Sequence, residues 1–481
     1  MRFPILLLAV WPVLLLSARP ATAAAPAERP NIVFILADDL GYAHLGCYGQ
    51  KIIQTPNLDR LAAEGMRFTQ AYAGCSVCAP SRSVLMTGYP MGHTSVRANT
   101  GGIPLRDEDV TIAEVLRAAG YTCGGFGKWG LGDAGTPGVP TRQGFAEFFG
   151  YLHQVHAHSY YPPYLWHNDR KHPLPGNSGN DRGLTGERRG QYSHDEIAAK
   201  ALDFIKRHKD RPFFCYVPFT IPHVEILAPE SAVKPYRGKF METPFVDPRK
   251  HYADQPTPRA VFAGMISHLD HSVGRIGDLV KELGLDRRTV IIFTSDNGAQ
   301  GGAGTDPQFF NATGPLRGFK GSLYEGGIRV PFIVRWPGAV KPGAVSEHVC
   351  SFADVLPTLA ELAGAEPPKG IDGVSFVPVL RGAKQKPHAY LYWELQQFNA
   401  KMGFIPNTLT QAVRVGDWKA VRPQGGGPLE LYDLSRDIGE SKNVAAEHPD
   451  VVAKIEAILK TCRTEPRPQR EPEKPAGKLF Q

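Results

Sequence analysis

NIVFILADD, residues 31–39, is the stretch of this 481-residue chain that decides its fold. Its first seven residues are apolar apart from Asn31 and show no alternation with polar residues, which predicts a strand buried on both faces. Strands of this kind belong to parallel sheets that are covered by helices. The strand ends in Asp38 and Asp39, and the carboxyl ends of parallel strands form the edge at which open α/β sheets bind ligands.

Similar apolar runs alternate with helical patterns over the first four fifths of the chain. This order predicts an α/β domain, 26–385, with a large, mostly parallel central sheet flanked by helices. The expected strands are 212–219, 289–294 and 330–336, and the expected helices are 55–65, 111–120, 193–205 and 259–283. Capping boxes predict the starts of two of these helices, with Thr111 and Ser193 as the caps.

The pattern changes after about residue 385. Short runs at 390–394, 411–415 and 418–421 predict a smaller antiparallel sheet, followed by a helix at 450–461. We assign 386–465 to this C-terminal subdomain and 466–481, which is rich in Pro and charge, to a flexible tail.

The first 25 residues have the pattern of a secretory signal peptide. A positive start at Arg2 precedes an apolar run of 5–16, and an A-x-A site follows at 21–23. The apolar run is too short to span a bilayer, and no Cys follows the site to carry a lipid. We therefore expect an exported protein, periplasmic or secreted, without a stable membrane anchor. The formal net charge is +7, but no Lys/Arg block of the nucleic-acid-binding type is present, so no nucleic-acid partner is expected.

A second pair of oxygen-bearing residues, Asp296 and Asn297, follows the expected strand 289–294. In a parallel sheet it would lie at the same edge as Asp38 and Asp39. Four oxygen-bearing side chains suit a hard cation such as Ca²⁺ or Mg²⁺. Acidic residues and Asn are also common in turns after strands, but the two pairs together favour a metal site.

The run Cys78-Ala79-Pro80-Ser81-Arg82, followed by Thr87 and Gly88, resembles the C-x-P-S-R signature of type I sulfatases with its T-G tail. Other segments resemble this family in the same order along most of the chain. They are 31–41, 55–59, 127–129, 222–223, 295–298, 318–321 and 324–331.

The resemblance implies a sulfuric ester hydrolase with the alkaline phosphatase-like fold. A formylglycine-generating enzyme would oxidise Cys78 to formylglycine, whose hydrate attacks the sulfate sulfur and later expels sulfate. A divalent cation, usually Ca²⁺ and otherwise Mg²⁺, would be held by residue 78 together with Asp38, Asp39, Asp296 and Asn297. The remaining catalytic residues implied are Arg82, Lys128, His223 and Lys320.

One position departs from the family pattern. The family commonly reads G-K-W-H-L-G, whereas this chain has Gly130 at the histidine position. In the family that histidine helps to expel sulfate. A substitute could come from His153, His156 or His158 in the long stretch 133–190, which is rich in Gly, Pro, His and aromatics and resembles a functional loop or lid.

Aromatic residues in the same stretch, Trp166 among them, could stack on sugar faces or pack the loop down. We favour a sulfated saccharide as substrate, with His153, His156, His158 and Trp166 as candidate contacts. Two alternatives remain open: a phosphonate or phosphodiester hydrolase on the same fold, and a non-catalytic binder of sulfated glycans, which only Gly130 supports.

Overall fold

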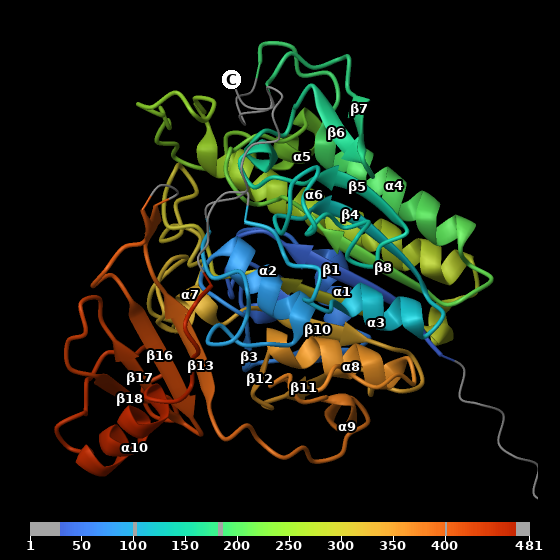
Figure 1. Cartoon of the computed structure of the whole chain (residues 1–481). Coiled ribbons are helices and arrows are strands. Elements are labelled where there is room, and N and C mark those ends of the chain that lie inside the picture. Colours follow the sequence, from blue (N-terminus) through green and yellow to red (C-terminus); the bar gives the residue numbers. More distant parts are fainter. Residues whose placement is uncertain (1–28, 100–102, 181–185, 400–401, 468–481) are drawn as a thin grey trace, which may run out of the picture.

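The computed structural model describes residues 29–99, 103–180, 186–399 and 402–467 (Figure 1). Within these residues the chain forms one ten-stranded sheet, one four-stranded sheet and two pairs of short strands. The expected signal peptide, and the expected tail from residue 468 onward, lie outside the described residues.

The ten-stranded sheet has β1 near its middle. β1 pairs in parallel with β8 on one side and β9 on the other, with Ile32 opposite Phe214 and Val290. β4 and β5 extend the parallel part, while β10, β6 and β7 pair antiparallel. The strand order is β11 (Ala344–Ser346), β2 (Met66–Phe68), β10 (Phe332–Arg335), β9 (Thr289–Ser295), β1 (Asn31–Ala37), β8 (Phe213–Pro218), β4 (Thr122–Lys128), β5 (Glu147–Tyr151), β6 (Tyr164–His167) and β7 (Arg170–Pro173).

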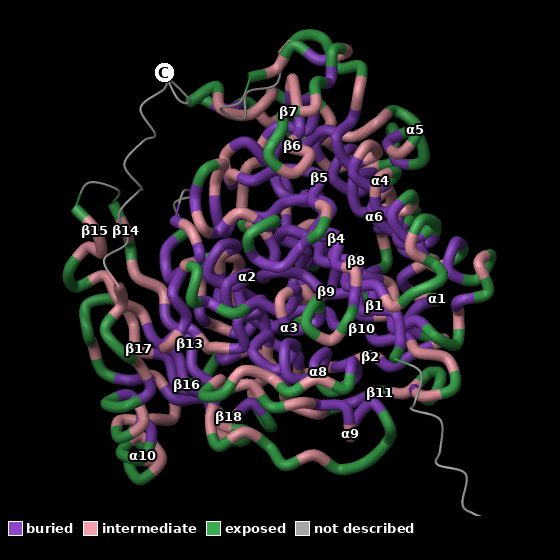
Figure 2. The backbone as a smooth tube through the Cα atoms, turned by 45° about the vertical axis from the view of Figure 1, so that its right-hand side comes forward, coloured by how far each residue is buried: buried purple, intermediate pink, exposed green. Residues whose placement is uncertain are grey.

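Helices cover both faces of this sheet, as the buried strands require. Successive side chains of a strand point to opposite faces, so Phe34 belongs to one hydrophobic core and Val33 and Ile35 to the other. Figure 2 shows the resulting buried interior. The first core lies under α2 (Cys78–Thr87), α3 (Ile112–Ala118) and α8 (Val355–Leu362), and the second under α1 (Pro56–Ala63), α4 (Ser193–Arg207) and α6 (Pro258–Glu282). The predicted α/β class and mostly parallel sheet are confirmed.

The stretch 133–190 differs from the loop expected there. It contributes β5, β6 and β7, which continue the central sheet at one edge. The sequence signal was weak because these strands are short and β7 is largely exposed, so the strands lack a sustained apolar pattern. Aromatic side chains of the stretch pack downward: Tyr160 donates a 3.1 Å hydrogen bond to the carbonyl of Thr220.

One of the two predicted capping boxes is confirmed. Thr111 and Glu114 cap α3 reciprocally. The other prediction is wrong, because Ser193 lies inside α4 and Tyr192 takes the cap position without a side-chain cap bond. The N–H of Ser193 instead donates to the carbonyl of Tyr160, which ties the helix start to the neighbouring loop.

A small antiparallel sheet follows the central one, as predicted, and lies beside it in Figure 1. Its strands are β13 (Leu391–Leu395), β16 (Thr410–Val415), β17 (Trp418–Arg422) and β18 (Glu430–Asp433), with α10 (Pro449–Leu459) after them. The short pairs are β3 (Ala71–Tyr72) with β12 (Cys350–Ser351), and β14 (Phe398–Asn399) with β15 (Gly403–Phe404). The short helices are α5 (Glu230–Val233), α7 (Glu325–Ile328) and α9 (Val377–Leu380).

All seven cysteines carry free thiols. Among the helices of the described residues, none has the length and apolar character needed to cross a membrane.

A buried ion pair network joins the small sheet to the central domain. Lys419 on β17 lies 2.9 Å from Glu325 and 2.9 Å from Glu440, and all three side chains are fully buried. Replacing Lys419 by methionine leaves the buried carboxylate of Glu440 without its cation and leaves Glu325 with Arg329 as its ionic partner. We expect the free energy of unfolding to fall by about 3–5 kcal/mol in guanidinium titrations. The matched control is Lys442→Met, whose pair with Glu447 is exposed and which should leave the free energy of unfolding nearly unchanged. Equal losses in the two variants would contradict this reading.

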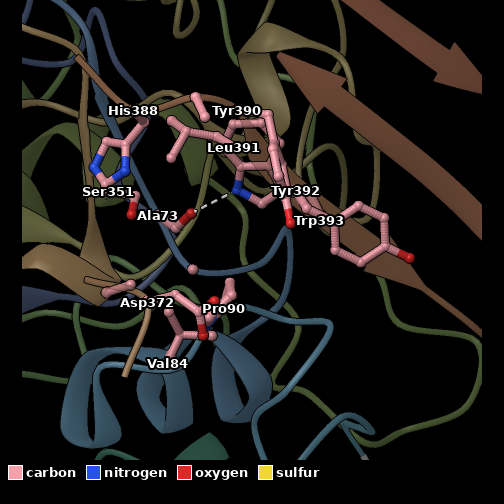
Figure 3. Close-up of a pocket in the computed structure, with 13 residues that line it drawn as sticks. Ala73, Val84, Pro90, Ser351, Asp372, His388, Tyr390, Leu391, Tyr392 and Trp393 are labelled. Carbon is pink, nitrogen blue, oxygen red and sulfur yellow. Dashed lines mark hydrogen bonds between the residues drawn. The ribbon is translucent and has the colours of Figure 1, made fainter. Parts of the chain in front are cut away.

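A cavity of about 230 Å³ lies where β13 approaches α2 (Figure 3). Trp393 lines it and donates a 2.9 Å hydrogen bond to the carbonyl of Ala73, while His388 lies 2.9 Å from Asp354. None of the residues that line it belongs to the site predicted from the sequence.

Candidate active site

The predicted site residues converge at one edge of the central sheet. They come from the ends of β1 and β9, from the start of α2, from the end of β4, and from loops that follow β8 and precede α7. One ligand atom from each of Asp38, Asp39, Cys78 and His223 lies within 4.8 Å of the others. The whole group of converging residues, called the cluster from here on, consists of Asp38, Asp39, Cys78, Arg82, Lys128, His223, Asp296, Asn297 and Lys320.

Cys78 is the first residue of α2 and is buried between the acidic residues. Its Sγ lies 3.3 Å from Asp38 Oδ1 and 3.9 Å from Asp39 Oδ1. Burial, together with the charges of Asp296 and Asp38, raises the pKa of the Cys78 thiol well above its usual value. Because the thiolate is the nucleophilic form of cysteine, an unmodified Cys78 is poorly suited to attack an ester.

The acidic residues are linked to one another across the two strand ends. Asn297 Nδ2 donates to Asp39 Oδ1 at 2.8 Å, and the N–H of Asp39 donates to Asp296 Oδ1 at 3.2 Å. Burial raises the pKa of Asp296 to about 7, with the negative charge of Asp38 as the next cause. The pKa of Asp38 is instead held well below its usual range: burial opposes its ionisation, but the charges of Lys128 and Arg82 outweigh the burial.

These residues fit a hard divalent cation. Asn297 Oδ1 is buried and has no hydrogen-bond partner among the described residues, although such an atom ordinarily has one. The oxygens of Asp38, Asp39, Asp296 and Asn297 form the donor set that Ca²⁺ or Mg²⁺ prefers. A cation bound there would satisfy the orphaned amide oxygen and stabilise three buried carboxylates.

Three basic side chains balance the carboxylates. Lys128 Nζ lies 2.6 Å from Asp38 Oδ2, and Lys320 Nζ lies 2.7 Å from Asp39 Oδ2. Arg82 binds Asp296 Oδ2 through Nε at 3.0 Å and Nη2 at 2.8 Å, and it also donates to the carbonyl of Lys128. The three basic groups neutralise three carboxylates, so adding a dication would leave the site with a net charge near +2. Such a site attracts an anionic ester.

His223 lies beside the cluster, with Nε2 3.6 Å from Asp39 Oδ2. Its Nδ1 contacts the carbonyl of Val224, which can only accept a hydrogen bond, so the neutral ring carries its proton on Nδ1. Burial and then the charge of Lys320 hold the pKa of His223 well below its usual value. In this structure the bare Nε2 therefore faces the cluster as an acceptor.

Of the four candidate substrate residues, His158 makes a described contact with the cluster. Its ring stacks on His223 with centroids 4.9 Å apart, and its Nδ1 lies 2.9 Å from His251 Nε2. His153 lies 3.9 Å from Asp133.

The other two candidates pack within the edge strands. His156 is buried, with its ring against Tyr151 and Tyr164, and Trp166 lies edge-on to Tyr164. None of these ring contacts involves a residue of the cluster.

Sequence reasoning missed several residues around the site. His251 and Tyr252 pack against His158 from the segment 247–254, and no motif marks them. Gln154 fills the space at Gly130: a Cβ added to Gly130 would lie 2.9 Å from Gln154 Nε2. The sequence suggests His153, His156 or His158 as a substitute for the missing histidine, whereas the side chain that packs against Gly130 is that of Gln154.

Comparisons with known proteins agree with this geometry. The sulfatase family model matches residues 30–365, and a model of the N-sulphoglucosamine sulphohydrolase C-terminal region matches 319–465. Human arylsulfatase A is 34% identical over 91% of this chain and 88% of its own length. An N-acetylgalactosamine-6-O-sulfatase of Bacteroides thetaiotaomicron is 30% identical over 91% of this chain and 94% of its own length.

Solved structures share the fold. The crystal structure of Ps i-CgsB in complex with k-i-k-neocarrahexaose superposes with a TM-score of 0.75 and 26% identity, covering 92% of this chain and 94% of that one. A structure reported under the metabolism of multiple glycosaminoglycans by Bacteroides thetaiotaomicron superposes with a TM-score of 0.73 and 29% identity, covering 91% of this chain and all of that one. The chain therefore belongs to the type I sulfatase family of the alkaline phosphatase-like superfamily and is a sulfuric ester hydrolase.

Proposed function

We propose that this enzyme removes sulfate from a sulfated carbohydrate, using a formylglycine made from Cys78 and a bound divalent cation. The observation that carries the proposal is the position of residue 78, which is buried between three carboxylates and three basic side chains. A formylglycine hydrate would supply the oxygen nucleophile that a thiol of raised pKa lacks. A divalent cation would lower the pKa of that hydroxyl and offset the charge of the sulfate.

The side chains of the cluster have distinct roles in this reaction. Lys128 and Lys320 bind the sulfate oxygens, where their charges stabilise the negative charge that develops in the transition state. Arg82, held by Asp296 and the carbonyl of Lys128, fixes the start of α2 against the metal ligands. His223 binds the ester group.

His223 also delivers a proton to the leaving alcohol. Burial opposes protonation of its ring, but a sulfate ester in the site adds a negative charge beside Nε2. The added charge raises the pKa of His223, so substrate binding itself favours the acidic form that the leaving alcohol needs.

The carbohydrate assignment rests on the relatives and on the rim of the site. N-acetylgalactosamine-6-sulfatases of dog and pig are each 33% identical over 80% of this chain. His158, His251 and Tyr252 gather beside His223. Rings of this kind offer a face to a sugar and donors or acceptors to its hydroxyls.

The proposal is tested by inorganic sulfate release from a panel of sulfated mono- and disaccharides, with a sulfated steroid and an aryl sulfate alongside. The protein is produced together with a formylglycine-generating enzyme. Release that is fastest from one saccharide linkage supports the proposal and names the sugar position. Faster turnover of the steroid or aryl sulfate rejects the carbohydrate assignment.

A phosphonate and a phosphodiester substrate belong in the same panel, because sulfate and phosphate esters have similar shapes. Within the described residues, a single group of His, Cys and Asp side chains is close enough together to hold a metal ion, whereas two-metal sites are common in phosphatases. We therefore expect sulfate esters to have the higher kcat/KM. The reverse order would assign the chain to phosphoester chemistry.

Maturation and location complete the proposal. The enzyme is exported, to the periplasm or outside the cell, and a formylglycine-generating enzyme acts on Cys78 before it becomes active. Mass spectrometry of the secreted protein tests both steps, since it reads the mature N-terminus and the side chain of residue 78.

Removal of the cation should abolish activity. The cation would bind beside Lys128 and Lys320, which lie 2.6 Å from Asp38 and 2.7 Å from Asp39, and its charge would add to theirs in offsetting the sulfate. We expect dialysis against a chelator to lower kcat by about 10²-fold or more, and added Ca²⁺ or Mg²⁺ to restore it. Full activity in protein shown by elemental analysis to be metal-free would contradict the cation's role.

A further inference from the structure

Helix α2 begins at the reacting residue, and the residue before it supplies no cap. The first N–H groups of a helix have no acceptor within the helix, and a side-chain oxygen at the N-cap position commonly provides one. Val77 takes that position and makes no cap hydrogen bond. The N–H of Ala79 donates instead to Asn99 Oδ1 at 3.0 Å. An acceptor from a loop 20 residues further along the chain therefore holds the turn that carries Cys78.

Gln154 holds Asn99 in this orientation. Its Nε2 donates to the same Oδ1 at 3.3 Å, and a carbonyl oxygen has two lone pairs, so it can accept both bonds. Gln154 is 6% exposed although Asn99 lies at the surface. The buried carboxamide thus fixes the direction of an otherwise exposed one.

Gly130 leaves the room that Gln154 occupies. Its φ is +77°, a conformation that favours glycine, and a Cβ built there would lie 2.9 Å from Nε2 and 3.1 Å from Cδ of Gln154. A side chain at residue 130 and the observed position of Gln154 therefore exclude one another. Gly130, which departs from the family motif, therefore leaves the space in which the side chain of Gln154 lies.

We propose that Gln154 and Asn99 form a carboxamide pair that positions residue 78 for reaction, in the space that a side chain at residue 130 would otherwise fill. Both are positioning residues: they act through the N–H of Ala79. The proposal rests on the proposed role of residue 78 as the source of the nucleophile. Lys128 and Lys320, which would bind the sulfate, do not depend on the pair, so its loss should lower kcat and spare KM.

The experiment compares Gln154→Ala, Asn99→Ala and the double variant with Gln143→Ala. Gln143 is the matched control, since it is an equally buried glutamine whose Nε2 donates to the carbonyls of Arg106 and Pro137. Each protein is made with a formylglycine-generating enzyme, and rates are expressed per formylglycine. We expect each single variant of the pair to lose about tenfold in kcat with KM within about twofold, the double variant to lose no more than either single one, and Gln143→Ala to keep its kcat.

Hydrogen–deuterium exchange in the peptide that contains Ala79 provides a second measurement that needs no substrate. Exchange should accelerate in Gln154→Ala and Asn99→Ala but not in Gln143→Ala. Unchanged exchange in the first two variants, or kcat within about twofold of the wild type, overturns the pair. Losses that multiply in the double variant also overturn it, because independent residues add in free energy. If the wild type were active without formylglycine, the proposed function would be rejected instead. The hydrogen–deuterium exchange measurement would still test whether Gln154 and Asn99 hold the N–H of Ala79.

Discussion

Replacing Cys78 by alanine should reduce sulfate ester hydrolysis by about 10⁴-fold or more, to the level of the uncatalysed background. Alanine cannot be converted to formylglycine, so the variant has no nucleophile. The environment of residue 78 supports this expectation, because its side chain lies at the start of α2, 3.3 Å from Asp38 and 3.9 Å from Asp39. The measurement is inorganic sulfate release under single-turnover conditions with the best substrate of the panel.

Cys75→Ala is the matched control for this variant. Cys75 is also buried and lies three residues away, but its Sγ approaches the carbonyl of Glu394 rather than the acidic cluster. It should keep activity close to that of the wild type. If Cys78→Ala retained more than about 1% of wild-type kcat while Cys75→Ala lost activity, the nucleophile would have been assigned to the wrong residue.

Replacing Lys128 by methionine should lower kcat by about 10²–10³-fold. Lys128 lies at the end of β4 and is 1% exposed. Its ammonium group lies 2.6 Å from Asp38. In the proposed reaction its charge stabilises the sulfate as negative charge develops, and methionine keeps the volume without the charge. The effect should fall on kcat more than on KM, because the interaction strengthens in the transition state.

Two controls separate this loss from a loss of folding. Lys281→Met removes an exposed lysine that pairs with Glu64, and its kcat should not change. Thermal unfolding of Lys128→Met with and without Ca²⁺ should show that the cation stabilises the variant, since Asp38 is left without its ammonium partner. A folded Lys128→Met with wild-type kcat would refute the proposed role of Lys128 in sulfate binding.

The sequence was sufficient to predict the class of fold and the convergence of the site. The apolar run of 31–37 predicts a strand buried on both faces, and β1 lies near the middle of a sheet with cores on both sides. Asp38 and Asp296 end neighbouring parallel strands, so strand order alone places them together. These features follow from local pattern combined with the rule that parallel strands share one carboxyl edge.

Other features depend on tertiary contacts that no local pattern records. The strands of 147–173 are short and lie at one end of the sheet, so their pairing depends on the strands already beside them. Ser193 matches a capping box in the sequence, but in the structure its N–H donates a hydrogen bond to the carbonyl of Tyr160 in a neighbouring loop. The surroundings of the site were hidden for the same reason. Gln154 packs against Gly130 and donates to Asn99, and His251 packs against His158, but the neighbours of these residues in sequence give no sign of the contacts.

If catalysis depends on formylglycine at position 78, activity must rise with the conversion of Cys78, and a titration of activity against conversion measures this dependence. Preparations with different amounts of the formylglycine-generating enzyme would span low to high conversion. The formylglycine fraction at residue 78 is then measured by mass spectrometry, and the rate of sulfate release is measured on the same samples. We expect the rate to be proportional to the formylglycine fraction and to extrapolate to zero when none is present. A rate that does not change with conversion, or that persists in protein with only the Cys78 thiol, would contradict it.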